Sequence, residues 1–444
     1  MILNEKTKQF ALAHADDDVR QLALKGCQDA EVDLPLALQQ ISGRQAARRK
    51  IPSWAALSDI CYPAHLSMEQ CSSEATARYK AQVVMGVIGP ISPMSPIRPM
   101  SPIGPMSPIN SRFRKLVDLT GGFGVDFSFL CTLFDEGVYV ERDETLCAIA
   151  HHNLQVLAST IETIDTIETI DTIETIETTV PINFSVVCAE AEEFLHRMEE
   201  HVTLIFIDPA RRDVHGARTF GISDCTPNIL PLRDELLSKA DYVLLKLSPM
   251  LDWRKAMADV GSDHVEQVHI VAVGGECKEL LLLLSAKGTK EPILVCSNDD
   301  KQDIFLLTKP AQPTPPTKPT PPTHYLYEPH PALMKAGLFA ELAQRYGVTP
   351  IAPNSHLFTS DAPVDDFPGR IFRVTAVSSM NKQELKEKVL PLKQANISVR
   401  NFPLTADALR KRLKLREGGD HYIFATTLAD GSRVLLLCQK PAGA

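Results

Sequence analysis

From residue 116 to residue 273, short apolar runs alternate with stretches whose apolar residues recur at helical spacing. This alternation constrains the fold more than any other feature, because strands that alternate with helices assemble into a parallel sheet covered on both faces. Ligands of such sheets bind beyond the carboxyl ends of the strands, where the strand order reverses. The expected strands span 116–120, 138–141, 184–188, 204–208, 242–247 and 265–273, and the expected helices span 126–134, 144–157, 191–200, 230–240 and 253–260.

Outside this region the sequence predicts a helical N-terminal region, 1–85, and a small basic α+β domain at the C-terminus. Residues 371–444 contain 13 Lys and Arg but 6 Asp and Glu, a net charge of +7, although the whole chain carries −9. Such a segment can face phosphate or can be a solvated surface of mixed charge, and the count does not choose between them. The expected elements span 371–376, 382–392, 397–400, 405–413, 421–428 and 433–439.

Three low-complexity stretches interrupt these patterned regions. The first stretch, 86–110, contains a triplet that ends in proline and repeats over 88–108. The second, 159–180, contains repeats of Ile-Glu-Thr and Ile-Asp-Thr over 161–178, and the third, 308–323, is rich in Pro and Thr. A proline tract can bind a partner and an acidic tract can mimic RNA. Their composition, however, is typical of disordered insertions in surface loops.

The cysteine pattern and the hydropathy indicate in which cellular compartment we expect the protein. The ten cysteines are scattered, without the paired spacing of a zinc site or a disulfide framework, so we expect a reducing compartment and no metal. The first twenty residues do not resemble a signal peptide, and no apolar run approaches the roughly 20 residues that span a bilayer. We therefore expect a cytoplasmic protein without a membrane partner, and we leave its oligomeric state open.

A glycine-rich loop, Asp118-Leu-Thr-Gly-Gly-Phe-Gly124, follows the first expected strand. A dinucleotide-binding loop needs G-x-G-x-x-G, but its third glycine would fall at position 127, which is Phe127. An acid at the strand end before G-G-x-G instead resembles motif I of class I S-adenosylmethionine-dependent methyltransferases. That resemblance implies a loop that cradles the amino-acid end of the cofactor and an acid that holds its ammonium group. The implied cofactor-binding residues are Asp118, Thr120, Gly121, Gly122 and Gly124.

Two further acids follow the next strands. Glu141 closes the second expected strand, where a carboxylate can accept both hydroxyls of a ribose. Its alternative role is an acid at a helix start, favoured by the helix dipole. Glu190 follows the third strand and is the candidate for contact near the adenine amine. It too can be a solvated acid at a helix start.

Asp208-Pro209-Ala210-Arg211 follows the fourth expected strand. Methyltransferases that act on amines place such an Asp-Pro motif there, where the acid and backbone carbonyls accept hydrogen bonds from the amine. Methyl transfer is an in-line displacement, so alignment of the reactants and the placement of charge supply most of the catalysis. Arg211 stands where an aromatic residue would stack on a base; a guanidinium can also stack, bind phosphate, or pair with local carboxylates.

An Asp-Pro-x-Arg motif also occurs in uridine C5 methyltransferases, which need a cysteine nucleophile after the fifth strand. That strand ends at Lys246-Leu-Ser248 and has no cysteine. Cys225 is the nearest alternative, and we expect it to be a buried small side chain instead. Lys246 and Ser248 are candidates to line the substrate pocket, although Lys246 could equally be a surface lysine.

Several segments together resemble the class I methyltransferases with a THUMP-like domain that occur in Bacteroidetes-type bacteria. The resemblance covers nearly the whole chain apart from the three low-complexity stretches. The segments that carry it are 71–80, 118–127, 139–142, 207–213, 246–252, 276–281, 354–360 and 418–427.

The resemblance implies an α/β fold: a Rossmann-like methyltransferase domain at 111–307, a ferredoxin-like segment at 324–369 and a THUMP-like domain at 370–444. THUMP domains bind RNA, usually tRNA, which agrees with the positive charge of the C-terminal residues. The basic candidates for substrate contact are Arg410, Lys411, Arg412 and Lys414.

Three hypotheses remain open from the sequence. The first is an S-adenosylmethionine-dependent methyltransferase that acts on a base amine in structured RNA such as tRNA. The second is a methyltransferase for a small molecule or protein, whose C-terminal domain serves packing or dimerisation. The third is a non-catalytic RNA-binding protein on the same fold. The nearly complete cofactor motifs favour an enzyme over the third.

Overall fold

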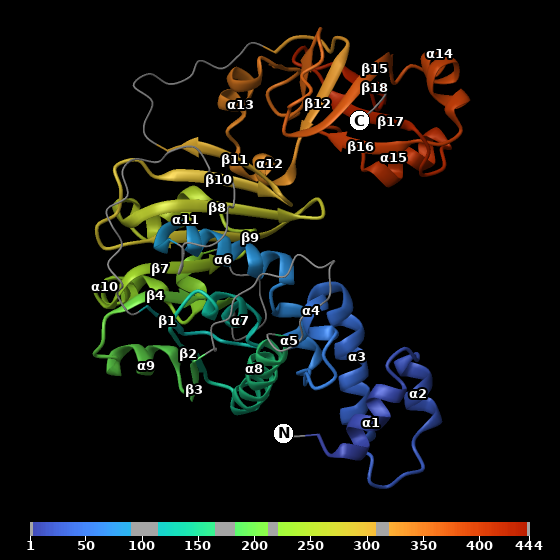
Figure 1. The fold of residues 1–444 in the computed structure, drawn as a ribbon. Coiled ribbons are helices and arrows are strands. Elements are labelled where there is room, and N and C mark those ends of the chain that lie inside the picture. Colours follow the sequence, from blue (N-terminus) through green and yellow to red (C-terminus); the bar gives the residue numbers. More distant parts are fainter. Residues whose placement is uncertain (1–2, 90–113, 165–182, 212–220, 308–318, 442–444) are drawn as a thin grey trace. The chain divides into compact units, whose positions relative to one another are not determined.

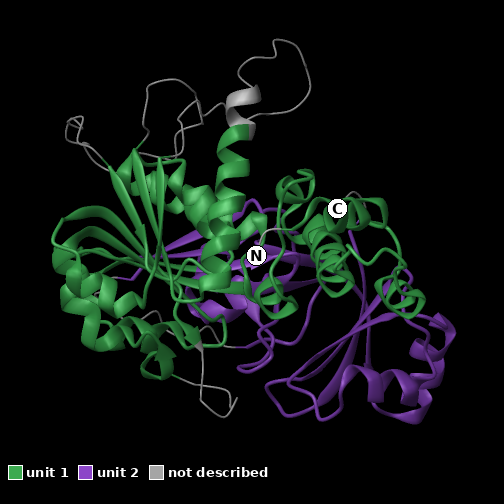
Figure 2. Cartoon of the chain, turned by 90° about the horizontal axis from the view of Figure 1, so that it is seen from below, with its two compact units in different colours: residues 1–269, 278–292 green, residues 270–277, 293–444 purple. Residues whose placement is uncertain are grey.

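The computed structural model describes residues 3–89, 114–164, 183–211, 221–307 and 319–441. The described chain forms two compact units: residues 1–269 with 278–292, and residues 270–277 with 293–444 (Figure 2). Most of the three low-complexity stretches lies outside the described residues, so their disorder stays a prediction.

Helices form the N-terminal part of unit 1. Asp33 and Ser73 accept hydrogen bonds from Leu36 N and Thr76 N and so cap two of these helices. A core around Trp54 and Tyr62 joins them to residues that follow β1. The helices are α1 (Glu5–Ala13), α2 (Val19–Lys25), α3 (Leu34–Lys50), α4 (Pro52–Ala55), α5 (His65–Gln70) and α6 (Glu74–Ile88).

The remainder of unit 1 is a twisted sheet with helices packed on it, so the predicted fold class is confirmed. Strands β1 to β4 and β7 run parallel, in the order β7-β4-β1-β2-β3 (Figure 1). The strands are β1 (Lys115–Asp118), β2 (Glu136–Glu141), β3 (Phe184–Cys188), β4 (Val202–Ile207), β5 (Ala210–Arg211), β6 (Cys225–Thr226), β7 (Ala240–Leu247), β8 (Val265–Val273) and β9 (Glu276–Leu284). Residues 270–273 of β8 and 276–277 of β9 count with unit 2. The helices are α7 (Val125–Cys131), α8 (Glu144–Ile164), α9 (Ala191–Arg197), α10 (Ile229–Lys239) and α11 (Trp253–Asp259).

Strand β9 departs from the expected parallel sheet. Its residues Leu280–Leu284 pair antiparallel with β7. The sequence pattern did not assign a strand here, because a run of five leucines shows neither strand nor helix periodicity.

Unit 2 contains a hairpin, β10 (Ile293–Asn298) and β11 (Lys301–Leu306), and a seven-stranded sheet of order β13-β14-β12-β15-β18-β17-β16. Apolar clusters that include Leu409 and Phe372 provide its cores. The sheet strands are β12 (Tyr325–Pro329), β13 (Thr349–Pro350), β14 (Phe358–Ser360), β15 (Gly369–Ser379), β16 (Asn396–Arg400), β17 (His421–Thr427) and β18 (Arg433–Gln439). The helices are α12 (Pro331–Ala336), α13 (Phe339–Tyr346), α14 (Lys382–Glu384) and α15 (Ala406–Leu413).

The helix expected over 382–392 is irregular. After α14 the chain continues as a π-helical turn, Leu385–Val389, and a 3-10 turn, Leu390–Leu392. Pro391 lacks the N–H that a continuing α-helix needs, which ends regular helix here.

Candidate active site

The strand order of unit 1 reverses between β1 and β4. From β1 the chain continues to β2 and β3 on one side, whereas β4 and β7 lie on the other. Asp118 ends β1 and Asp208 comes directly after β4, and Asp118 is the register partner of Phe206. Two acids that the sequence singled out therefore flank the point where ligands of such sheets bind.

Tight packing explains the glycines of the loop between β1 and α7. A Cβ on Gly121 would lie 2.1 Å from the ring of Tyr139, so any side chain there would collide. Gly124 has φ +89°, a conformation that favours glycine. The Tyr139 hydroxyl donates a hydrogen bond to Gly122 O, 2.5 Å away. The loop is thus held against β2 with its backbone in one arrangement.

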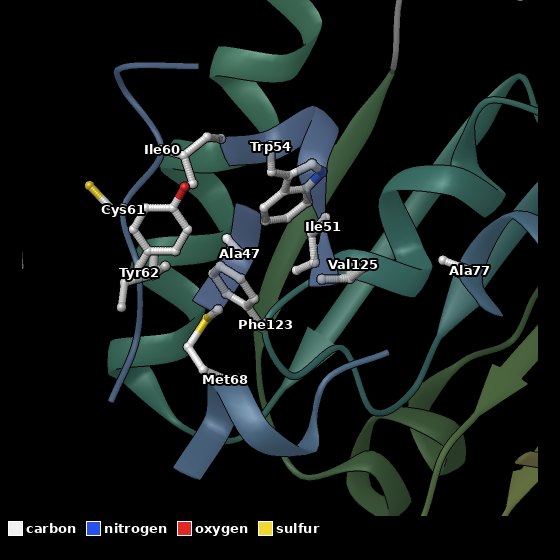
Figure 3. Close-up of a cluster of buried hydrophobic side chains, with 11 residues drawn as sticks. Ala47, Ile51, Trp54, Ile60, Cys61, Tyr62, Met68, Ala77, Phe123 and Val125 are labelled. Carbon is white, nitrogen blue, oxygen red and sulfur yellow. The ribbon is translucent and has the colours of Figure 1, made fainter. Parts of the chain in front are cut away.

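The phenylalanine of this loop anchors it to the N-terminal helices. Phe123 is 3% exposed and packs in a cluster with Trp54, Tyr62 and Met68 (Figure 3). Its ring meets that of Trp54 edge-on, with 5.0 Å between the centroids. The N-terminal helical region therefore holds the loop in place through the side chain of Phe123, a role that the sequence pattern did not reveal.

Asp118 presents an unpaired acceptor beside the loop. Its Oδ1 accepts a hydrogen bond from Thr120 N at 2.9 Å. Its Oδ2 is buried and has no hydrogen-bond partner among the described residues. Burial raises the pKa of Asp118 well above its ordinary value. A cationic donor at Oδ2 would relieve this cost, so the site fits the ammonium group of S-adenosylmethionine.

Glu141 braces the same loop. Its Oε2 accepts a hydrogen bond from Gly122 N at 2.9 Å, and its Oε1 accepts from Arg142 N and Asp143 N at 2.9 and 3.0 Å. An ionised carboxylate has about four acceptor positions, so one remains for a ribose hydroxyl. Glu190 lies just before α9, is 61% exposed, and has its Oε2 3.9 Å from Arg142 Nη1.

Asp208 is tied to both neighbouring strands. Its backbone N–H donates to Thr120 Oγ1 at 2.7 Å, and its Oδ2 accepts a hydrogen bond from Lys246 Nζ at 2.5 Å. The side chain remains 36% exposed, whereas that of Lys246 is 10% exposed. Lys246 therefore fixes a carboxylate that is still accessible, and the interpretation of Lys246 as a surface lysine is wrong.

Behind this ion pair lies a row of buried charges. Lys246 Nζ is 3.4 Å from Asp126 Oδ2, and Asp126 Oδ1 is 3.1 Å from Lys80 Nζ. Lys80 is fully buried and its Nζ is 2.5 Å from Glu279 Oε2. We call Asp208, Lys246, Asp126, Lys80 and Glu279 the charge row. It links α6, α7, β7, β9 and the end of β4.

Ser72, although uncharged, contacts three members of the charge row. Its hydroxyl lies 2.7 Å from Asp126 Oδ2 and 3.2 Å from Glu279 Oε1, and it accepts a hydrogen bond from Lys80 Nζ at 3.2 Å. A buried charge is tolerated only when it is paired and hydrogen-bonded. The serine accepts from Lys80 and, with its single proton, donates to one of these two carboxylates at a time.

The charges of the row follow from these contacts. Burial opposes the charge on Lys246, but Asp208 and Asp126 outweigh it and hold the pKa of Lys246 well above its ordinary value. Burial likewise opposes ionisation of Asp126, whose pKa is nevertheless lowered by Lys80 and Lys246. Burial raises the pKa of Asp208, and Lys246 offsets part of that rise. Lys246 is thus a fixed cation rather than a proton acceptor.

Sequence reasoning missed Ser72, Lys80, Asp126 and Glu279. The three charged residues lie in apolar stretches of the sequence: Lys80 precedes the buried Val83 and Val84 on α6, Asp126 lies between two buried apolar residues on α7, and Glu279 precedes the leucine run of β9. A charged residue at a position that periodicity assigns to the core was the available signal.

The remaining Asp-Pro motif residues are only partly described. Pro209 is buried and Ala210 exposed. Ala210 and Arg211 form β5, antiparallel to β6, with Arg211 opposite Cys225. The Arg211 side chain lies outside the described residues, so its stacking stays a prediction. Cys225 is 5% exposed, as expected of a buried small side chain.

The other substrate candidates lie elsewhere. Ser248 Oγ accepts a hydrogen bond from Met250 N in the turn after β7, which gives it a local structural role. On α15, Arg410 pairs with Asp407 and Glu417 at 2.7 and 3.2 Å. Lys411, Arg412 and Lys414 are exposed.

Neither a metal-binding cluster nor a membrane-spanning helix occurs in the described residues. Within the described ranges, no group of three or more His, Cys, Asp or Glu could hold a metal ion. No helix in that part of the chain is long and apolar enough to span a membrane.

Comparisons with known proteins identify two C-terminal domains and relatives that match most of the chain. Residues 325–368 match a family described as a ferredoxin-like domain, and residues 369–440 match one described as THUMP domain-like. A crystal structure of a presumed methyltransferase from Porphyromonas gingivalis W83 is 31% identical, with a TM-score of 0.79 over 99% of this chain and 100% of that one. An uncharacterized S-adenosylmethionine-dependent methyltransferase of Mycobacterium tuberculosis is 23% identical over 330 residues, 72% of this chain and 79% of its own length.

Proposed function

This chain belongs to the family of class I S-adenosylmethionine-dependent methyltransferases that carry a C-terminal THUMP-like domain, and from that premise we propose that it methylates a base amine in structured RNA. The single observation that carries the proposal is the partly exposed carboxylate of Asp208, which Lys246 holds at the switch point of the sheet. The nature of this acceptor and its position beside Asp118 point to an amine rather than a carbon nucleophile.

S-adenosylmethionine, when bound, supplies a methyl group on a positively charged sulfur. We assign Asp118 to its ammonium group, because Oδ2 is a buried acceptor in need of a donor. Glu141 would accept a hydrogen bond from the ribose, and Glu190 would lie near the adenine amine. Backbone groups of the loop would complete the site, from the residues Thr120, Gly121, Gly122 and Gly124.

Asp208 would act on the substrate. Its carboxylate accepts a hydrogen bond from the amine N–H, and backbone carbonyls of the Asp-Pro motif, including those of Pro209 and Ala210, can accept the other. The nitrogen lone pair is then directed at the methyl carbon, which favours in-line displacement. In the transfer a C–N bond would form as the C–S bond breaks, with the electron pair remaining on sulfur, and the nitrogen would lose one proton to Asp208 or solvent. Arg211 would stack on the base or contact a phosphate.

The C-terminal domain supports RNA as the substrate. Residues 371–444 carry a net charge of +7 in a chain of net charge −9. Exposed Lys411, Arg412 and Lys414 are available for phosphate contacts. Structured RNA, with tRNA first among the candidates, therefore fits this domain better than a small molecule does.

The test is methyl transfer from labelled S-adenosylmethionine to purified tRNA, rRNA, total protein and a small-molecule extract. We expect label in an RNA fraction with wild-type protein and none with Asp208→Asn. Mass spectrometry of nucleosides from cells with and without the gene would then identify the methylated base. Label only in protein or small molecules would refute the RNA substrate, and no transfer despite cofactor binding would refute the enzymatic proposal.

A further inference from the structure

We propose that Lys80 of α6 is a positioning residue that keeps Lys246 on Asp208 by satisfying Asp126. The inference deepens the proposed function and rests on it, because the charge of Asp208 matters only if Asp208 orients the amine. The ammonium group of Lys80 contacts Ser72, Asp126 and Glu279. Its effect on Asp208 would therefore pass through two intervening side chains.

The contacts of Asp126 explain why Lys246 lies closer to Asp208. Its carboxylate lies between two cations, Lys80 at 3.1 Å and Lys246 at 3.4 Å. Lys246 in turn lies between two carboxylates and is closer to Asp208, at 2.5 Å, than to Asp126. Because Lys80 already neutralises Asp126, the stronger contact of Lys246 goes to Asp208.

The balance of charges explains why the loss of Lys80 would change the protonation of Asp208. With every group ionised, the charge row contains three carboxylates and two ammonium groups. Two carboxylates of other elements disfavour the ionised form of Asp208: Asp126 of α7 and Glu279 of β9. Asp118 of β1 also interacts with Asp208, but its own pKa is raised well above the ordinary value, chiefly by burial. Lys246 of β7 is the cation that opposes them. If Lys80 were lost, Asp126 would compete for Lys246, and Asp208 would bind a proton at higher pH.

A protonated Asp208 would fail in the proposed reaction. Its hydroxyl would donate a hydrogen bond where the carboxylate must accept one from the amine. Lys80 thereby gives the N-terminal helical region a function in the reaction, beyond packing against the loop. A purely structural anchor between α6 and β9 would not alter the protonation of Asp208.

The pKa of Asp208 can be measured without any substrate. Protein labelled with carboxyl-¹³C aspartate is titrated by NMR, and the Asp208 signal is the one absent from Asp208→Asn. We expect Lys80→Met to raise the pKa of Asp208 by about one unit. An unchanged pKa in folded Lys80→Met protein overturns the proposal.

Two pairs of variants control for misfolding and test whether the effect of Lys80 on Asp208 passes through Asp126. Lys80→Met leaves the buried Glu279 without its cation, which can unfold the protein. The Glu279→Gln variant is therefore compared with the double variant Glu279→Gln/Lys80→Met. We expect the same rise in the pKa of Asp208 between these two proteins. In an Asp126→Asn background, Lys80→Met should raise the pKa much less, because the neutral amide at position 126 does not compete for Lys246. An equal rise in that background would overturn the route through Asp126.

Activity provides the second readout. If the protein methylates RNA, the acidic limb of kcat/KM should move to higher pH in Lys80→Met by the same amount as the NMR value. A shift of the Asp208 pKa in a protein that methylates no RNA would refute the proposed substrate but not the charge row. A shift in neither measurement refutes the role of Lys80.

Discussion

The backbone N–H of Asp208 donates a hydrogen bond to the hydroxyl of Thr120, 2.7 Å away. This contact joins the loop after β1, which we assign to the cofactor, to the loop after β4, which we assign to the substrate. The separation of the two reactants therefore depends partly on one threonine hydroxyl.

Replacement of Thr120 by Val should lower kcat/KM by roughly 5–30-fold, because the loss of this partly buried hydrogen bond costs about 1–2 kcal/mol. Kinetics with labelled cofactor would measure the change. Thr120→Ser keeps the hydroxyl and serves as the matched control. Equal activity of Thr120→Val and Thr120→Ser would mean that the contact does not align the reactants.

Replacement of Gly121 by Ala should destabilise the protein by about 1–3 kcal/mol, the usual range for overpacking, and weaken cofactor binding. The new Cβ would lie 2.1 Å from the Tyr139 ring. Thermal unfolding and calorimetric titration with S-adenosylmethionine measure both effects. Gly86→Ala is the control: Gly86 lies within α6 with nothing within 4 Å of the added Cβ, so it should be neutral or slightly stabilising. A fully stable Gly121→Ala protein with normal affinity would contradict the packing argument.

Replacement of Phe123 by Ala should cost about 3–5 kcal/mol of folding free energy, since it empties a site in the core around Trp54. The loop should also become less ordered, so cofactor affinity should fall. Chemical denaturation measures the first effect and calorimetry the second. Leu24→Ala removes a side chain that is 89% exposed and should leave both values unchanged. If Phe123→Ala lowered stability but not affinity, the helical region would not shape the loop.

The stability of the cofactor-free protein should depend on Asp118. Because the folded pKa of Asp118 is raised above its unfolded value, its contribution is fully present below the unfolded pKa and is lost as pH rises through the folded pKa. Asp118→Asn removes this loss, so the variant should gain stability relative to wild type as pH rises. Thermal unfolding across a pH series measures the difference.

With the cofactor present the order should reverse. The ammonium group favours ionised Asp118, so wild type should bind S-adenosylmethionine more tightly as pH rises, and Asp118→Asn should bind weakly at every pH. Equal cofactor-induced stabilisation of wild type and variant would rule out Asp118 as the ammonium acceptor.

Replacement of Lys411 or Lys414 by Ala should weaken RNA binding and reduce the slope of log Kd against log salt by about one for each phosphate that the lysine neutralises. Binding of labelled tRNA at several salt concentrations provides the measurement. Arg410→Ala should have a smaller effect, because Arg410 is already paired with Asp407 and Glu417. A larger effect of Arg410→Ala would place the RNA surface elsewhere.

Much of the fold could be predicted from local patterns. The spacing of apolar residues identified β3 and β8 with their observed bounds, and the alternation of strands and helices indicated the parallel sheet. The pattern missed β9, whose leucine run has no period, and it predicted a regular helix over 382–392, where Pro391 interrupts one. The acids at the strand ends were found because a parallel sheet brings all its carboxyl ends to one edge.

By itself the sequence determined most strands of the sheet, the loop from Asp118 to Gly124 and the acid that follows β4, since these depend on neighbours a few residues apart. Only the tertiary structure decided that Lys246 is a buried partner of Asp208, and that Lys80 meets Glu279 across 199 positions of the chain. A buried charge is stable only beside its counterion, and which distant segments provide that counterion is settled when the whole unit packs.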